Sequence, residues 1–190
     1  MNSFIITPDY FKLPEDGKLV RESGIENRYN RALERTDDHF TVDKDDWSDG
    51  VIRYTVNGEI KFYGIQECKR LARTNSIWER ITQGLFYVCN WLEIYPELFK
   101  KFKVLVLPTE KFIDIIYINN LLNSSFWTQF KFYYHEHKLK KGSASNFYKQ
   151  SADIRALIMD YAPRLNITRK EIGQELDFKI VTEEILRNCL

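Results

Sequence analysis

The sequence predicts an α/β fold in which a small mixed β-sheet is flanked by helices. Three segments support this prediction: two β-prone runs flank Asn57–Gly58, a long amphipathic run covers residues 75–95, and residues 102–108 are short and apolar. An Asn-Gly pair between two such runs is the strongest short signal for a hairpin. Helices that alternate with strands are typical of layered α/β domains.

The first 49 residues contain one predicted helix. Residues 1–19 carry Pro8, Pro14 and Gly17, so we expect irregular structure there. Residues 22–35 place apolar side chains on one helical face, and Ser23 can cap the start, which predicts a helix. Residues 34–49 hold seven acidic side chains, and we expect a loop that can hold cations.

The middle of the chain gives the clearest prediction. Residues 51–69, VIRYTVNGEIKFYGIQECK, should form a β-hairpin that turns at Asn57–Gly58. Residues 75–95 carry apolar side chains at helical spacing, and Pro96 should end that helix. Residues 102–108, FKVLVLP, should form a buried strand.

The rest of the chain is predicted to be helical. Helices are expected at residues 110–122, at 125–138 after Ser124 or Ser125, and at 148–161, with a loop at 140–146. Thr168 and Glu171 form a capping-box pattern, and Thr182 is expected to cap a last short helix. We therefore assign residues 1–165 to one domain and residues 166–190 to a short helical extension.

Composition excludes several classes of protein. Apolar residues make up 44% of the 190 residues, enough for a sizeable core, and the net charge of +1 gives no global basic field. The three cysteines are widely spaced, which fits neither a disulfide framework nor a cysteine metal cluster and suits a reducing cytoplasm. We expect no signal peptide and no membrane span, since no apolar run approaches about 18 residues.

A polar triplet at the end of the hairpin suggests chemistry. Glu67 and Lys69 share one face of the second strand because side chains alternate across a strand. The hairpin returns Asp49, at the start of the first strand, to the same end. The two carboxylates and the carbonyl of Cys68 are oxygen ligands that suit Mg²⁺, and such an ion can activate water beside a phosphodiester.

These residues resemble the PD-(D/E)XK nuclease superfamily. Asp49 followed by Glu67-x-Lys69 on the second strand of a hairpin matches its central motif, with Ser48 in place of the usual proline. Gln83-x-x-x-Tyr87 on the next helix matches the extra motif of the RecB-like and lambda-exonuclease-like branch. Residues four apart on a helix share a face, so both side chains can reach the site.

The resemblance implies a restriction-endonuclease-like core and a Mg²⁺-dependent deoxyribonuclease, with Mn²⁺ as a substitute, that leaves 5′-phosphate ends. It implies that Asp49, Glu67 and the Cys68 carbonyl bind the metal and that Lys69 is the catalytic lysine. Gln83 and Tyr87 would contact substrate or support the site. The upstream helix often supplies one more acidic residue, for which Glu26 is best placed.

The register of the hairpin leaves one alternative open. A strict two-residue turn at Asn57–Gly58 places Asp49 opposite Gln66, and Asp46 opposite Lys69. Either a bulge shifts the register by one residue, or Asp46 is the ligand. We retain Asp49 because the Ser48–Asp49–Gly50 turn resembles that of the family.

Two further expectations concern partners. Four lysines near several aromatic residues could grip phosphates and stack bases of DNA: Lys138, Lys140, Lys141 and Lys149. The low net charge suggests that a second copy or a partner domain completes the DNA groove. The alternatives are a non-cleaving nucleic-acid-binding module on the same fold, the nuclease domain of a larger restriction–modification protein, and an interaction protein with a solvated acidic loop.

Overall fold

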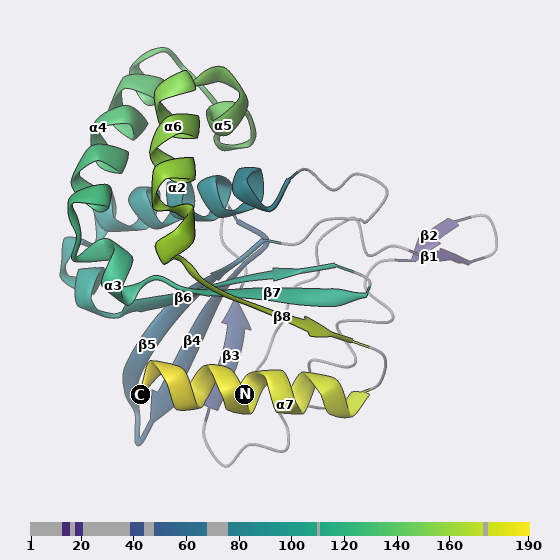
Figure 1. Ribbon diagram of the computed structural model, residues 1–190. Coiled ribbons are helices and arrows are strands. Elements are labelled where there is room, and N and C mark those ends of the chain that lie inside the picture. Colours follow the sequence, from purple (N-terminus) through teal and green to yellow (C-terminus); the bar gives the residue numbers. More distant parts are fainter. Residues whose placement is uncertain are drawn as a thin grey trace.

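The structure is a computed structural model that describes residues 13–15, 18–20, 39–43, 48–67, 76–109, 111–172 and 175–190 (Figure 1). A six-stranded sheet has the order β3-β4-β5-β6-β7-β8, and β1 pairs with β2 in a separate two-stranded sheet. The pair β5–β6 is parallel and the other pairs are antiparallel, so the sheet is mixed, as the sequence predicts. The strands are β1 Leu13–Glu15, β2 Lys18–Val20, β3 His39–Asp43, β4 Gly50–Val56, β5 Glu59–Gln66, β6 Phe102–Pro108, β7 Phe112–Tyr117 and β8 Asn166–Glu171.

The predicted hairpin is confirmed as β4 and β5. Asn57 and Gly58 both have positive φ, 50° and 79°, which a tight two-residue hairpin turn requires. The register shifts between Tyr54 and Thr55: Thr55 pairs with Ile60 and Tyr54 with Phe62, which leaves Lys61 as the extra residue of a β-bulge. Beyond the bulge, every pair is displaced by one residue from the strict two-residue register.

Helix α2, Ile77–Ile94, connects β5 to its parallel neighbour β6. It begins after Ser76, whose side chain accepts a hydrogen bond from the backbone N–H of Glu79. The helix ends before Pro96, which starts the 3₁₀ turn η3, Pro96–Lys100. The predicted helix at 75–95 and strand at 102–108 are therefore confirmed. Gly64 of β5 allows the close approach of β6, since a Cβ there would lie 2.6 Å from Val104 Cγ1.

Several secondary-structure predictions are wrong. Strand β1 and the start of β2 lie within residues 1–19, where irregular structure was expected, because the two strands pair with each other. Residues 112–117 form β7 rather than a helix, because Phe112–Tyr117 is rich in isoleucine and pairs with strands on both sides. The capping-box pattern of Thr168 and Glu171 lies in β8, so the C-terminal extension is not wholly helical. Residues 39–43 form β3 within the expected acidic loop, where they pair with β4.

Helices cover both faces of the sheet (Figure 1). Helices α2, α4, α5 and α6 lie on one face, while α7 crosses the other. Thr182 lies inside α7 and does not cap it, so that prediction is also wrong. The remaining elements are α3 Asn119–Leu122, α4 Ser125–Leu139, η4 Ala144–Asn146, α5 Phe147–Gln150, α6 Ala152–Tyr161, η5 Ala162–Arg164 and α7 Glu175–Cys189.

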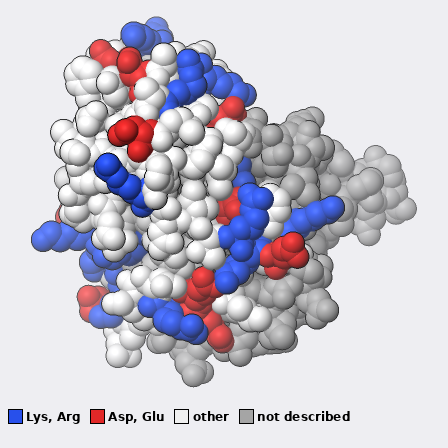
Figure 2. Space-filling view, in the orientation of Figure 1, with Lys and Arg blue, Asp and Glu red and all other residues white. Residues whose placement is uncertain are grey.

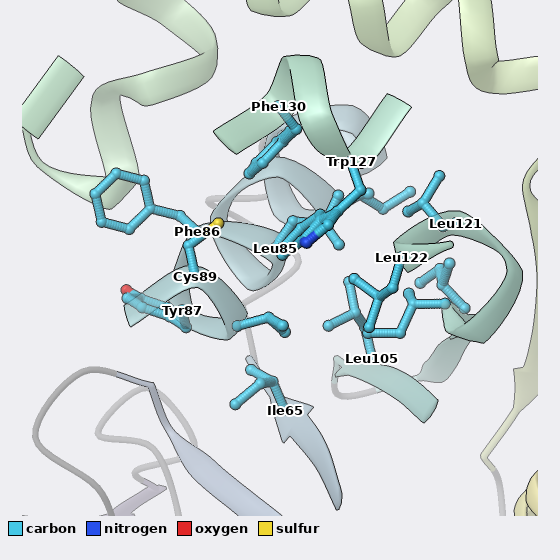
Figure 3. Close-up of a cluster of buried hydrophobic side chains, with 14 of the residues drawn as sticks. Ile65, Leu85, Phe86, Tyr87, Cys89, Leu105, Leu121, Leu122, Trp127 and Phe130 are labelled. Atoms are coloured by element: carbon cyan, nitrogen blue, oxygen red, sulfur yellow. The ribbon is translucent and has the colours of Figure 1, made fainter. Parts of the chain in front are cut away.

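Two apolar clusters follow the alternation of the strands. Ile65 and Leu105 point from the sheet toward Leu85 of α2, and the cluster continues to Trp127 and Phe130 of α4 (Figure 3). The opposite face of the sheet packs against α7 through residues such as Val181. Odd-numbered positions of β4, β5 and β6 therefore point toward α2 at the end of the sheet where Val51, Ile65 and Leu107 lie.

Other predictions lie partly outside the described residues. Residues 22–35, where a helix is expected, lie outside the described residues, so the structure does not test that prediction. In the part of the chain that is described, no helix is long and apolar enough to cross a membrane.

Candidate active site

The predicted strand carboxylate and the predicted helix motif meet in the structure. Gln83 Nε2 donates one hydrogen bond to Glu67 Oε1, at 2.7 Å, and a second to the hydroxyl oxygen of Tyr87, at 2.8 Å. All three side chains are buried, with 3%, 6% and 9% of the surface of Glu67, Gln83 and Tyr87 exposed. The amide thus uses both N–H groups to connect the end of β5 with α2.

Local structure explains why these side chains meet. Glu67 directly follows β5, and its backbone N–H donates to the carbonyl of Val106 at 3.0 Å, so the chain still lies against β6. Its side chain points toward α2, on the same face as Ile65 two residues earlier. Gln83 and Tyr87 are one helical turn apart on the buried side of α2. The crossover from β5 to β6 therefore brings the motif over the carboxylate.

The bulge places Asp49 in register with Glu67. The last pair in the register of the hairpin is Gly50 with Gln66, so the next residues outward are Asp49 and Glu67. Asp49 is half-buried, and by alternation it lies on the face of Val51, which belongs to the cluster beneath α2. The sequence analysis required a bulge in the hairpin if Asp49 rather than Asp46 is the ligand, and the structure contains one. Asp46 itself lies outside the described residues.

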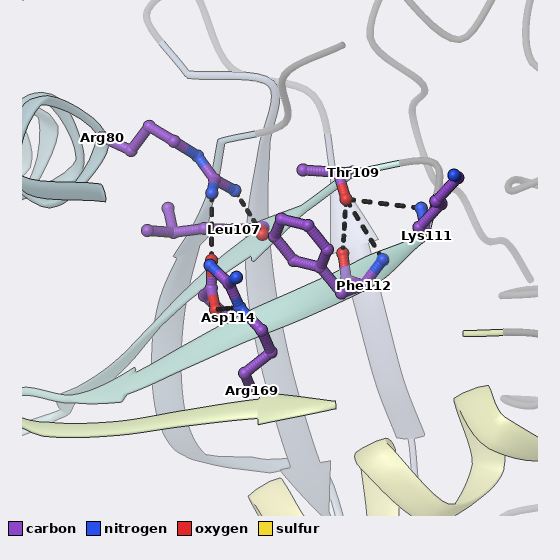
Figure 4. Close-up of polar contacts among 7 residues, drawn as sticks. All are labelled: Arg80, Leu107, Thr109, Lys111, Phe112, Asp114 and Arg169. Carbon is purple, nitrogen blue, oxygen red and sulfur yellow. Dashed lines mark hydrogen bonds and ion pairs between the residues drawn. The ribbon is translucent and has the colours of Figure 1, made fainter. Parts of the chain in front are cut away.

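A charged cluster that sequence analysis missed connects α2 with β7 and β8 (Figure 4). Arg80 Nη1 of α2 contacts Asp114 Oδ2 of β7 at 3.0 Å, and Arg80 Nη2 donates to the carbonyl of Leu107. Arg169 of β8 binds the same carboxylate with Nε at 2.7 Å from Oδ1 and Nη2 at 3.0 Å from Oδ2. Asp114 is fully buried and Arg80 is 2% exposed.

The sequence holds one signal for this cluster. Asp114 is a lone carboxylate in the apolar run FIDIIY, and a charged side chain in such a run is rarely buried unless it is paired. Because β7 was predicted to be a helix, neither partner could be assigned. Arg80 is three residues before Gln83 on α2, so the pair with Asp114 fixes the helix next to the candidate site.

The four predicted DNA-binding lysines divide into two pairs. Lys138 Nζ contacts Glu93 Oε2 at 2.6 Å and the hydroxyl of Tyr134 at 2.9 Å. Lys149 Nζ lies 3.5 Å from Glu79 Oε2, in the first turn of α2. The other two, Lys140 and Lys141, are exposed in the turn after α4. Two of these lysines are thus already next to carboxylates.

The remaining predicted site residues are Glu26, Cys68 and Lys69, and they lie outside the described residues. Within the described residues, no three His, Cys, Asp or Glu side chains are grouped closely enough to hold a metal ion. The two carboxylates in register, Asp49 and Glu67, have the oxygen chemistry that a hard cation such as Mg²⁺ prefers. The predicted metal site therefore stays a prediction.

Comparisons with known proteins returned no match. No family model, no curated protein and no solved structure matched the chain. A functional assignment must therefore depend on the geometry and chemistry of the residues themselves.

Proposed function

We propose that this chain is a Mg²⁺-dependent DNA nuclease with a restriction-endonuclease-like core. The observation that supports the proposal best is the double hydrogen bond of Gln83 to Glu67 and Tyr87. It connects two motifs that the sequence resemblance identified separately. A surface ion pair on an edge strand, the simplest alternative for Glu67, would leave that carboxylate exposed, whereas it is 3% exposed and directly follows β5, a strand inside the sheet.

Each residue has a distinct role in the proposed reaction. Asp49 and Glu67 hold the metal, and Gln83 fixes the orientation of the Glu67 carboxylate by binding Oε1. Tyr87 accepts the second N–H of Gln83 and so keeps the amide from turning over. Lys69 orients the attacking water. A bound Mg²⁺ would activate that water and stabilise the charge that develops on the phosphodiester.

DNA cleavage tests the proposal directly. Purified protein is incubated with linear and circular DNA, single- and double-stranded, with Mg²⁺, with Mn²⁺ or with a chelator. We expect metal-dependent cutting that disappears in Glu67→Gln and in Lys69→Ala. Glu59→Gln is the matched control, because Glu59 is an exposed carboxylate at the opposite end of β5 that contacts Lys61.

The possible results separate the candidate functions. Cutting that survives Glu67→Gln would remove this site from the reaction. Binding of DNA without cutting by the wild-type protein would favour the non-cleaving module instead. Neither binding nor cutting would exclude both nucleic-acid functions under these conditions and would favour the interaction protein.

A further inference from the structure

Arg169 is held in one orientation at the edge of the sheet. Two of its nitrogens bind the Asp114 carboxylate, at 2.7 Å and 3.0 Å. Its guanidinium carbon also lies 3.8 Å from the centroid of the Phe112 ring, which is a cation–π contact. Even so, 53% of the Arg169 side chain is exposed. The group is therefore both fixed and accessible.

Neutralisation of Asp114 does not require Arg169. Arg80 is buried and already pairs with that carboxylate, so one cation balances one anion in the interior. With Arg169, the three groups carry a formal net charge of +1, and the cation nearest to solvent is Arg169. The hydrogen bond to Asp114 also raises the pKa of Arg169 above its ordinary value.

The position of Arg169 relates it to the candidate site. Arg169 pairs with Asp114 across β7 and β8, and Asp114 meets Arg80 of α2, so all three lie on the face toward which Glu67 points. Strand β8 is three strands from β5, which corresponds to about 14 Å at the usual spacing of about 4.8 Å. Figure 2 shows Lys and Arg side chains along the surface where Figure 1 places β7 and β8, with acidic side chains between them.

We propose that Arg169 binds a backbone phosphate of the DNA substrate, away from the phosphate that is cut. The inference rests on the proposed nuclease function. The two bonds to Asp114 use two of the five N–H groups of the guanidinium, so the other three point away from that carboxylate. Phosphate oxygens, like carboxylate oxygens, are acceptors that match the geometry of a guanidinium group. Such a contact sets the register of the strand on the enzyme.

Salt dependence of DNA binding measures this contact. A short labelled duplex is titrated with protein in a chelator at several salt concentrations, and the slope of log K against log salt is compared between variants. Loss of one phosphate contact should reduce the slope by about 0.9 in Arg169→Gln. Arg164→Gln is the matched control, since Arg164 also lies over an aromatic ring, Tyr161, but precedes the opposite end of β8. Lys170→Gln controls for charge on the α7 face, where Lys170 contacts Glu184.

Each outcome decides between the two claims. If the wild type binds DNA and Arg169→Gln keeps the full slope, the phosphate contact is wrong while the nuclease proposal stands. If the wild type neither binds nor cuts DNA, both fail. If Arg169→Gln does not fold, the wild type is modified at arginine with phenylglyoxal, with and without DNA. DNA should slow the modification of Arg169 but not that of Arg164. Equal protection of the two arginines by DNA, or protection of neither, would overturn the inference.

Discussion

Glu67 and Arg80 are anchored to consecutive residues of one strand. The backbone N–H of Glu67 donates to the carbonyl of Val106, and the Arg80 guanidinium donates to the carbonyl of Leu107. Strand β6 therefore fixes both the end of β5 and the first turns of α2. Gln83, one turn after Arg80, reaches Glu67 because both of these attachments hold.

Arg80→Met should destabilise the fold. The substitution leaves the fully buried Asp114 with Arg169 as its remaining guanidinium partner and removes the bond to Leu107. Loss of one hydrogen bond to the Asp114 carboxylate costs roughly 2 kcal/mol, which urea unfolding can measure. Arg187→Met, at an exposed position of α7, should change the free energy of unfolding by less than about 0.5 kcal/mol. Equal stability of Arg80→Met and the wild type would show that the pair carries no net free energy.

Gln83→Leu should reduce DNA cutting more than Tyr87→Phe. The first change removes a donor from the Glu67 carboxylate, whereas the second removes only the hydroxyl that accepts from Gln83. A hydrogen bond to a charged group contributes about 2 kcal/mol, or roughly thirtyfold in rate, and a neutral one about 1 kcal/mol, or roughly fivefold. Cleavage rates and urea unfolding are measured together, so that loss of fold is distinguished from loss of activity. A larger effect of Tyr87→Phe would contradict the role given to Gln83.

Asp49→Asn should abolish metal-dependent cutting, and Asp46→Asn should not. The bulge at Lys61 brings Asp49 into register with Glu67, and the amide is a poorer ligand for a hard cation than the carboxylate. The two variants change net charge equally, so each controls for the other. Calorimetric titration with Mn²⁺ gives a second measurement that does not depend on cleavage. Loss of activity only in Asp46→Asn would mean that the register at the site differs from the one described here.

Glu93→Gln should reduce the amount by which the free energy of unfolding falls in acid. Burial raises the pKa of Glu93, but hydrogen bonds from Lys138 and Tyr134 outweigh it and hold the pKa below its ordinary value of 4.5. A carboxylate whose pKa is lower in the folded state than in the unfolded state stabilises the fold at pH values above its unfolded pKa. This stabilisation is lost as the pH falls through the pKa of the folded state. Urea unfolding from about pH 7 to about pH 3 should show a shallower decline in Glu93→Gln. Glu97→Gln, an exposed carboxylate of η3, should decline like the wild type.

The parts of the fold that sequence analysis predicted are those with local causes. The hairpin depends on Asn57–Gly58, and α2 depends on its own periodicity and on Pro96. Strand β7 was assigned to a helix because part of its identity comes from pairing with β8, which is distant in sequence and was itself assigned to a helical extension. The choice between Asp49 and Asp46 stayed open because the residues near Lys61 carry no sequence pattern that predicts the bulge.

The same distinction applies to the candidate site. Glu67, Gln83 and Tyr87 could be found because a spacing pattern on one strand and one helix resembles a known family. The cluster of Arg80, Asp114 and Arg169 could not be found in this way. Its contacts depend on the pairing of β7 with β8 and on the packing of α2 against the sheet. Contacts between distant segments follow from topology, and one sequence does not specify topology residue by residue.

The parallel pairing of β5 with β6 has a consequence for refolding. The hairpin and α2 are each local and can form early, but parallel strands can pair only after the intervening chain has closed into a crossover. Docking of β6 then supplies the carbonyls of Val106 and Leu107 at the same moment as it extends the sheet. We therefore expect recovery of the candidate site to coincide with the slowest cooperative step of refolding, with no partly folded species that carries a working site.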